Sequence, residues 1–365
     1  RLYPPFIEQY EFYEDFDRYT VFDLNNDGRT FDYFPTYYGS YVVMYGNGLA
    51  DPETGFVPTA NDDMFFSPKM ALKKGVTYRM FMPLEAPSVP ESFHLYIAKE
   101  VSPTAQMQKV NDIYFSWDKE YYMDELFSVA EDGDYHFVMH SDQKGNSAGF
   151  YVDNLMVLIH GTDGAPAMVD NLKATAGAKG AIANTVSFNA PRKTYDGKTL
   201  SSITKICIFK GSDVKHPVYT FENPAPGESL TWDDPNPEYG SQFYTITTYN
   251  EVGVGGTAYI ENWVGLDIPI MPQNFYAKQI VEDGAFKPSF TWDAVPAVGA
   301  HGGYVDLDDV TYHIAYGYVD VMQQWDYVVK TQDTKAVADY DYPGYQDIAT
   351  YRIEARNAAG TSDCS

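Results

Sequence analysis

Acidic and amide side chains alternate near the start of the chain, in the stretch TVFDLNNDGRTF at 20–31. Asp23, Asn25 and Asp27, with the glycine that follows, form the pattern D-x-N-x-D-G. Calcium gathers hard oxygen ligands from short loops of this kind. An EF-hand is excluded, because the twelfth loop position is Phe34 instead of glutamate and the flanking residues are typical of strands. The same residues also suit a hairpin turn, since Asn, Asp and Gly tolerate positive φ, and the sequence leaves both alternatives open.

Paired acids could in principle perform glycoside hydrolysis, and the sequence offers two adjacent pairs, Asp62-Asp63 and Asp124-Glu125. Adjacent pairs are expected among 51 acidic residues, however, and most such side chains lie in solvent. The sequence has no G-x-S-x-G elbow, no HExxH helix and no CxxC pair. We therefore predict a protein without enzymatic activity.

A tyrosine-rich stretch, YFPTYYGSYVVMYGNG, follows the acidic loop. Tyr37, Tyr38 and Tyr41 are the candidate ligand-binding residues, with Tyr45 beside them. Tyrosine offers a flat apolar face with a polar rim, which suits stacking on a sugar ring or anchoring a protein partner. The alternative is that these residues only pack a sheet, because aromatic residues are common in strands.

The composition restricts the possible partners and indicates the fold class. The formal net charge of -26 repels phosphate backbones and anionic lipids, so nucleic acid is not an expected partner. No apolar run is long enough to predict a transmembrane segment. Short alternating runs rich in tyrosine and phenylalanine, broken by Gly, Pro, Asn and Asp, predict an all-β protein.

An internal repeat organises the second half of the chain. Asn171-Leu172-Lys173-Ala174 recurs as Asn274-Phe275-Tyr276-Ala277, and Phe188 corresponds to Trp292 as the large residue between two sheets. YTITTYNEVG at 244–253 recurs as YRIEARNAAG at 351–360. These ten-residue segments resemble the fibronectin type III pattern Y-x-V-x-A-x-N-x-x-G. The sequence therefore predicts two such β-sandwiches, at 165–267 and 268–365, the second apparently lacking its last strand, joined by Gly- and Pro-rich linkers at 161–167 and 265–272.

The first block, 1–162, is predicted to be a jelly-roll sandwich. Its segments DFDRYTVFDLNNDGRTF, DDMFFSPKMAL, GDYHFVMH and FYVDNLMVL resemble, in order, the signatures of the cleaved-adhesin or choice-of-anchor J family. Phe31 and Met64 stand where that family usually has tryptophan, which we interpret as repacking of core positions. The resemblance implies a non-catalytic module with structural calcium, in which Asp153 would be a further ligand to the metal.

The resemblance implies a secreted or surface-exposed bacterial protein that binds host protein or glycan. The alternatives are an accessory region of a larger extracellular peptidase or glycosidase, or a purely structural stalk. This functional expectation comes from the family resemblance, because a fold alone does not determine function.

Overall fold

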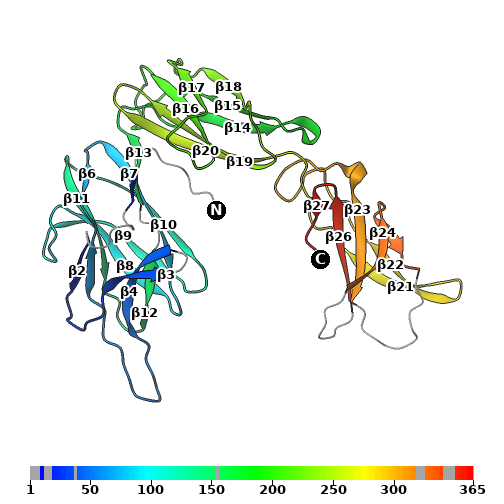
Figure 1. Ribbon diagram of the computed structural model, residues 1–365, viewed down its shortest axis with the longest axis horizontal. Coiled ribbons are helices and arrows are strands. Elements are labelled where there is room, and N and C mark those ends of the chain that lie inside the picture. The colour runs from blue at the N-terminus through cyan, green and yellow to red at the C-terminus, as the bar shows by residue number, and fades with distance from the viewer. Residues whose placement is uncertain are drawn as a thin grey trace.

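The computed structural model describes residues 9–11, 19–36, 39–152, 156–317, 325–339 and 350–364. In these residues almost all regular structure is antiparallel β-strand, interrupted by two single-turn 3₁₀-helices, η2 (Ala178–Gly180) and η3 (Leu307–Asp309). The predicted all-β class is confirmed. Figure 1 shows the strands gathered into three groups that follow the order of the chain: β1 to β13, β14 to β20, and β21 to β27. Among the described residues, no helix has the length and apolar character needed to cross a lipid bilayer.

Two sheets face each other in the first group and enclose its main core. One sheet has the order β1-β13-β7-β12-β4-β3, with β10 also beside β7, and the other has the order β2-β5-β11-β8-β9, with β6 beside β11. Phe65, Phe93 and Phe137 from one sheet meet Met44 and Phe150 from the other, all fully buried or nearly so. The strands are β1 (Gln9–Glu11), β2 (Thr20–Asp23), β3 (Phe31–Thr36), β4 (Gly39–Gly48), β5 (Asp63–Phe66), β6 (Met70–Leu72), β7 (Val76–Glu85), β8 (Glu91–Ala98), β9 (Met107–Phe115), β10 (Tyr121–Ser128), β11 (Gly133–Ser141), β12 (Ser147–Val152) and β13 (Met156–Thr162).

The outward face of the β2-β5-β11-β8-β9 sheet is only partly solvated. Alternation along β8 and β11 points one set of side chains into the core. On the opposite face, however, Met64, Phe66, Ala98 and Val138 form a second, smaller buried cluster. Met64 packs in this outer cluster, whereas Phe31 packs in the main core. Both positions are therefore buried, Phe31 between the two sheets and Met64 on the outer face of one of them.

The acidic loop does not close a hairpin. Strand β2 pairs with β5 in one sheet, and β3 pairs with β4 in the other. The residues between them therefore carry the chain from one sheet to the opposite one. This corrects the hairpin alternative, although Asn26 and Gly28 do adopt the positive φ that such a turn requires, at 57° and 77°.

The second and third groups share one plan, with a three-stranded sheet packed on a four-stranded sheet. The orders are β14-β15-β18 against β17-β16-β19-β20, and β21-β22-β25 against β24-β23-β26-β27. The strands are β14 (Asp170–Ala176), β15 (Asn184–Asn189), β16 (Lys205–Lys210), β17 (Tyr219–Glu222), β18 (Ser229–Asp233), β19 (Gly240–Tyr249), β20 (Val254–Val264), β21 (Tyr276–Glu282), β22 (Ala285–Thr291), β23 (Thr311–Gly317), β24 (Trp325–Thr331), β25 (Lys335–Val337), β26 (Thr350–Asn357) and β27 (Gly360–Thr361).

Each of these two groups has its own hydrophobic core. Phe188 is buried in the first of them and Trp292 in the second, as the repeat predicts. At the end of the third group, where the sequence predicts that the last strand is missing, the two-residue strand β27 pairs with β26. The main cores draw on residues 31–157, 169–246 and 290–355. The division into domains at 162, 165, 267 and 268 remains a prediction.

Specific contacts hold both predicted linkers. In the first linker, Gly161 belongs to β13 and Ala165 is completely buried. In the second, Leu266 forms a parallel bridge with Tyr304, and the backbone N–H of Asp267 donates to the carbonyl of Tyr304 at 2.8 Å. Glycine is required at 161 and 265, because a Cβ there would lie 2.2 Å from the ring of Tyr195 and 2.5 Å from the ring of Tyr239.

Candidate functional site

The side chains of the acidic loop hydrogen-bond to the backbone of the loop itself. Asp23 accepts from the N–H groups of Asp27 (3.2 Å) and Gly28 (2.8 Å), and Asp27 accepts from the N–H of Arg29 at 2.8 Å. The Asn25 amide donates to the carbonyl of Ala60 at 2.9 Å and tethers the loop to the chain before β5. Such local bonds explain why Asp and Asn occupy this turn.

A fourth oxygen-bearing residue, Asp63, belongs to the same corner. It stands opposite Asp23 in the pairing of β2 with β5, so the two side chains share a face of the sheet. Asp63 is completely buried, and neither of its carboxylate oxygens has a hydrogen-bond partner of ordinary geometry. Burial raises its pKa to about 7; the hydroxyl of Thr30 opposes this rise, and the negative charges of Asp23 and Asp27 add to it.

This corner matches the chemistry of a calcium site in its donor set. A carboxylate buried with so little hydrogen bonding is costly, and a divalent cation would neutralise it. Asp23, Asn25, Asp27 and Asp63 would supply carboxylate and amide oxygens, the ligands that calcium prefers. In the described residues no three His, Cys, Asp or Glu side chains converge in metal-binding geometry, so the loop carboxylates would have to exchange their backbone bonds for the metal.

Several predicted site residues lie outside the described part of the chain. Asp153, Tyr37 and Tyr38 are among them. Tyr41 lies in β4 opposite Phe34 of β3, and only its backbone is described. The roles of these residues in metal or ligand binding remain predictions.

Neither adjacent acid pair forms a dyad. Asp63 faces the core, whereas the carboxylate of Asp62 is hydrogen-bonded to His140 Nε2, at 2.8 Å, on the outer side of the sheet. Asp124 and Glu125 are consecutive in β10, so they point to opposite faces; Asp124 binds Arg79, and Glu125 accepts from another side chain. Asp63 is an exception to the expectation that most such acids lie in solvent, because its register in the sheet buries it.

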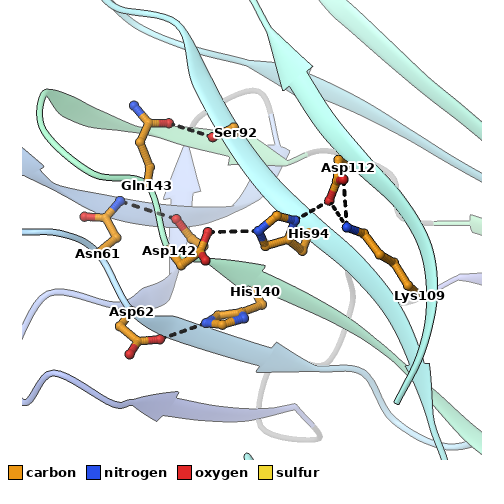
Figure 2. A network of polar contacts seen from close by, with 10 residues as sticks. Asn61, Asp62, Ser92, His94, Lys109, Asp112, His140, Asp142 and Gln143 are labelled. Carbon is orange, nitrogen blue, oxygen red and sulfur yellow. Dashed lines mark hydrogen bonds and ion pairs between the residues drawn. The ribbon is translucent and has the colours of Figure 1, made fainter.

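Sequence reasoning did not single out the polar network on the outer face of the β2-β5-β11-β8-β9 sheet (Figure 2). His94 of β8 stands directly opposite His140 of β11, with ring centroids 6.2 Å apart. His94 contacts Asp112 through Nδ1 and Asp142 through Nε2, the latter at 3.1 Å, while Lys109 binds the same Asp112. The hydrogen bonds from Lys109 and His94 hold the pKa of Asp112 below its usual value.

The network presents fixed polar groups next to an aromatic ring. The side chain of His94 is 32% exposed, and those of Asp112 and Asp142 are about half exposed, so a ligand can reach them. Tyr96, two residues along β8 and on the same face, has its ring centroid 6.1 Å from that of His94. Because each polar side chain is held by a neighbour, binding a ligand here would immobilise few additional rotamers. The signal in the sequence is that histidines occupy polar positions of the alternating runs FHLYIA and YHFVMH, at 93–98 and 135–140.

Comparisons with known proteins give likenesses of shape. No family model matches the chain, and no curated protein sequence matches it. The K1 cleaved adhesin domain of Lys-gingipain from Porphyromonas gingivalis W83 is similar at 12% identity and a TM-score of 0.33, covering 41% of this chain and 96% of that domain. The CBM22-1 xylan-binding domain of Paenibacillus barcinonensis Xyn10C is similar at 13% identity and a TM-score of 0.28, covering 44% of this chain and 97% of that domain.

Proposed function

We propose that this protein is a non-catalytic, secreted or surface-exposed binding protein whose partner is a host protein or a glycan. The observation that carries the proposal is the network around His94 and His140 (Figure 2), a partly exposed array of fixed donors and acceptors on the outer sheet face. Fixed polar groups next to an aromatic side chain suit the hydroxyls of a sugar or the polar groups of a protein surface. The resemblance of the first block to adhesin modules supports the same function.

The test is binding of the full chain to an array of glycans and matrix proteins. We expect binding that weakens at least tenfold in the double variant His94→Ala/His140→Ala, and that is affected by Tyr38→Ala or Tyr41→Ala if the tyrosine stretch contributes. His216→Ala is the matched control, because His216 also pairs with an aspartate, at 3.0 Å, but lies on the second sandwich. Binding that all these variants leave unchanged would remove this sheet face from the proposal, and silence across the array would favour a structural stalk.

We also propose that calcium stabilises the acidic corner. At a free concentration one hundred times the dissociation constant, a ligand specific for the folded state adds about 2.7 kcal/mol of stability. For a unit of this size we expect the melting temperature of the first sandwich to rise by about 5–10 °C. Asp63→Asn should remove most of the shift, whereas Asp134→Asn, which removes an exposed carboxylate, should preserve it. An unchanged melting temperature at millimolar calcium would refute the proposal.

A further inference from the structure

A cavity of about 520 Å³ lies between the first and second sandwiches. Strands β7, β10 and β13 form one wall; β20 and the residues before β14 form the other. Strands β13 and β20 pack against each other across the junction. The volume falls in the range typical of small-ligand sites, which often occur between domains.

The junction that shapes this cavity is tightly fitted. His160 Nδ1 and the hydroxyl of Tyr195 are hydrogen-bonded at 2.6 Å. At Gly161 there is no room for a side chain, because a Cβ would lie 2.2 Å from the ring of Tyr195. The amide of Asn250 donates to the carbonyl of Gly164 at 3.0 Å. The two walls are therefore held in place before any ligand arrives, which lowers the entropic cost of binding.

The charged groups of the lining balance each other. The guanidinium of Arg79, on β7, donates through two nitrogens to both carboxylate oxygens of Asp124, on β10. Their side chains are 14% and 39% exposed, so the pair lies at the surface of the cavity. Burial, and secondly the charge of Arg79, lower the pKa of His160, which keeps that imidazole neutral at neutral pH. The lining therefore carries no net charge and gives no advantage to an anionic or cationic ligand.

Large side chains with exposed apolar surface surround the ion pair of Arg79 and Asp124. Tyr259 of β20 is 55% exposed, Leu126 of β10 is 52% exposed and Met168 is 47% exposed. Tyr259 is backed by Phe243, with ring centroids 6.1 Å apart and planes inclined by 27°. An aromatic ring supported in this way gives a firm amphipathic surface.

We propose that the cavity binds one or two sugar units of a neutral oligosaccharide. The apolar C–H face of the sugar would lie on Tyr259, and its neighbouring hydroxyls, which both donate and accept, would bond to Asp124 and Arg79. The net charge of -26 further opposes acidic glycans. This inference rests on the proposed binding function, and it names both a ligand class and a second site, separate from the histidine network.

The test uses the full chain and calorimetric titration with defined probes: xylohexaose, laminarihexaose, maltohexaose and lacto-N-tetraose as neutral glycans, and 3′-sialyllactose as an acidic one. We expect at least one neutral probe to bind, with the affinity at least tenfold lower in Tyr259→Ala and in Asp124→Ala. Tyr259→Phe should keep most of the affinity, and Met168→Trp should block the cavity sterically. Tyr276→Ala, which changes a 65% exposed tyrosine on the third sandwich, is the matched control. Melting temperatures show which variants remain folded, and Met168→Trp provides a second route if Asp124→Ala does not fold.

The outcomes separate this inference from the proposed function. Neutral-glycan binding that is insensitive to Tyr259→Ala and Met168→Trp but lost in His94→Ala/His140→Ala would overturn the cavity site and keep the function. Binding of a matrix protein with no response to any neutral glycan would do the same. Preference for the sialylated probe would refute the charge argument, and absence of all binding would refute both proposals.

Discussion

Glu91, at the start of β8, offers the most direct test of the energetics of the first sandwich. Its carboxylate is completely buried. It accepts hydrogen bonds from the hydroxyl of Ser147 at 2.8 Å and from the backbone N–H groups of Ala148 at 2.7 Å and Gly149 at 3.1 Å. Burial is the largest influence on its pKa and raises it to about 7, although the three hydrogen bonds act in the opposite direction.

The rise in pKa determines the sign of the pH dependence. Between pH 4.5 and 7 the folded protein keeps a proton on Glu91 that the unfolded chain releases, so the free energy of unfolding falls as the pH rises. The difference between 4.5 and about 7, at 1.36 kcal/mol for each pH unit, corresponds to about 3 kcal/mol. Glu91→Gln removes this titration. It also leaves the hydroxyl proton of Ser147 without its acceptor, which costs about 1 kcal/mol.

We therefore expect the effect of Glu91→Gln on the free energy of unfolding to change sign between pH 4.5 and pH 8. Glu91→Gln should be less stable than the native protein by about 1 kcal/mol at pH 4.5 and more stable by about 2 kcal/mol at pH 8. The assay is urea denaturation of both proteins across this pH range, with the exposed Glu85→Gln as control. Taking the difference between the two proteins cancels the titration of all other groups. Parallel stability profiles for the native protein and Glu91→Gln would show that the carboxylate is not held as described.

Two further substitutions test the structure at other positions. Asp267→Ala should destabilise the chain by about 3–5 kcal/mol, because this fully buried carboxylate accepts from three backbone N–H groups and contacts the imidazole of His301 at 2.7 Å. Denaturation would measure the loss of stability, and limited proteolysis would detect opening of the segment 265–272. An unchanged proteolysis pattern would contradict this prediction. Gly149→Ala should unfold the first sandwich, because a Cβ there would lie 2.0 Å from the carbonyl of Met44. Gly145 has a similar positive φ but open space around it, so Gly145→Ala should cost only about 1 kcal/mol of stability. Equal melting temperatures for the two variants would refute the predicted clash.

The sequence predicted those features that depend on local alternation and on the repeat. The strands flanking the acidic loop and the buried positions of Phe188 and Trp292 follow from side-chain periodicity and the repeat. Periodicity cannot tell which strand neighbours which in a sandwich. For that reason the sequence leaves a hairpin open for the residues between β2 and β3. In the structure these residues cross from one sheet to the other.

The candidate sites were less accessible to sequence reasoning, because they are assembled across strands. Asp63 is buried through its register with β2 and β11, and one residue earlier Asp62 reaches the opposite face. His94 and His140 are 46 positions apart and meet only because β8 pairs with β11. The cavity beside Tyr259 requires two sandwiches in a fixed arrangement, and no motif encodes such an arrangement.

The repeat itself acquires a physical explanation in the hydrogen bonds of its asparagines. Asn250 donates through its side chain to the carbonyl of Gly164, and the corresponding Asn357 donates to the carbonyl of Asp267, at 3.0 and 2.8 Å. In each case the side-chain oxygen accepts an N–H from the turn that follows. The asparagine therefore forms the turn and also fixes the segment that enters its own sandwich. Because both asparagines bond to the residues that enter their sandwiches, the repeat keeps this residue at the same place in each copy.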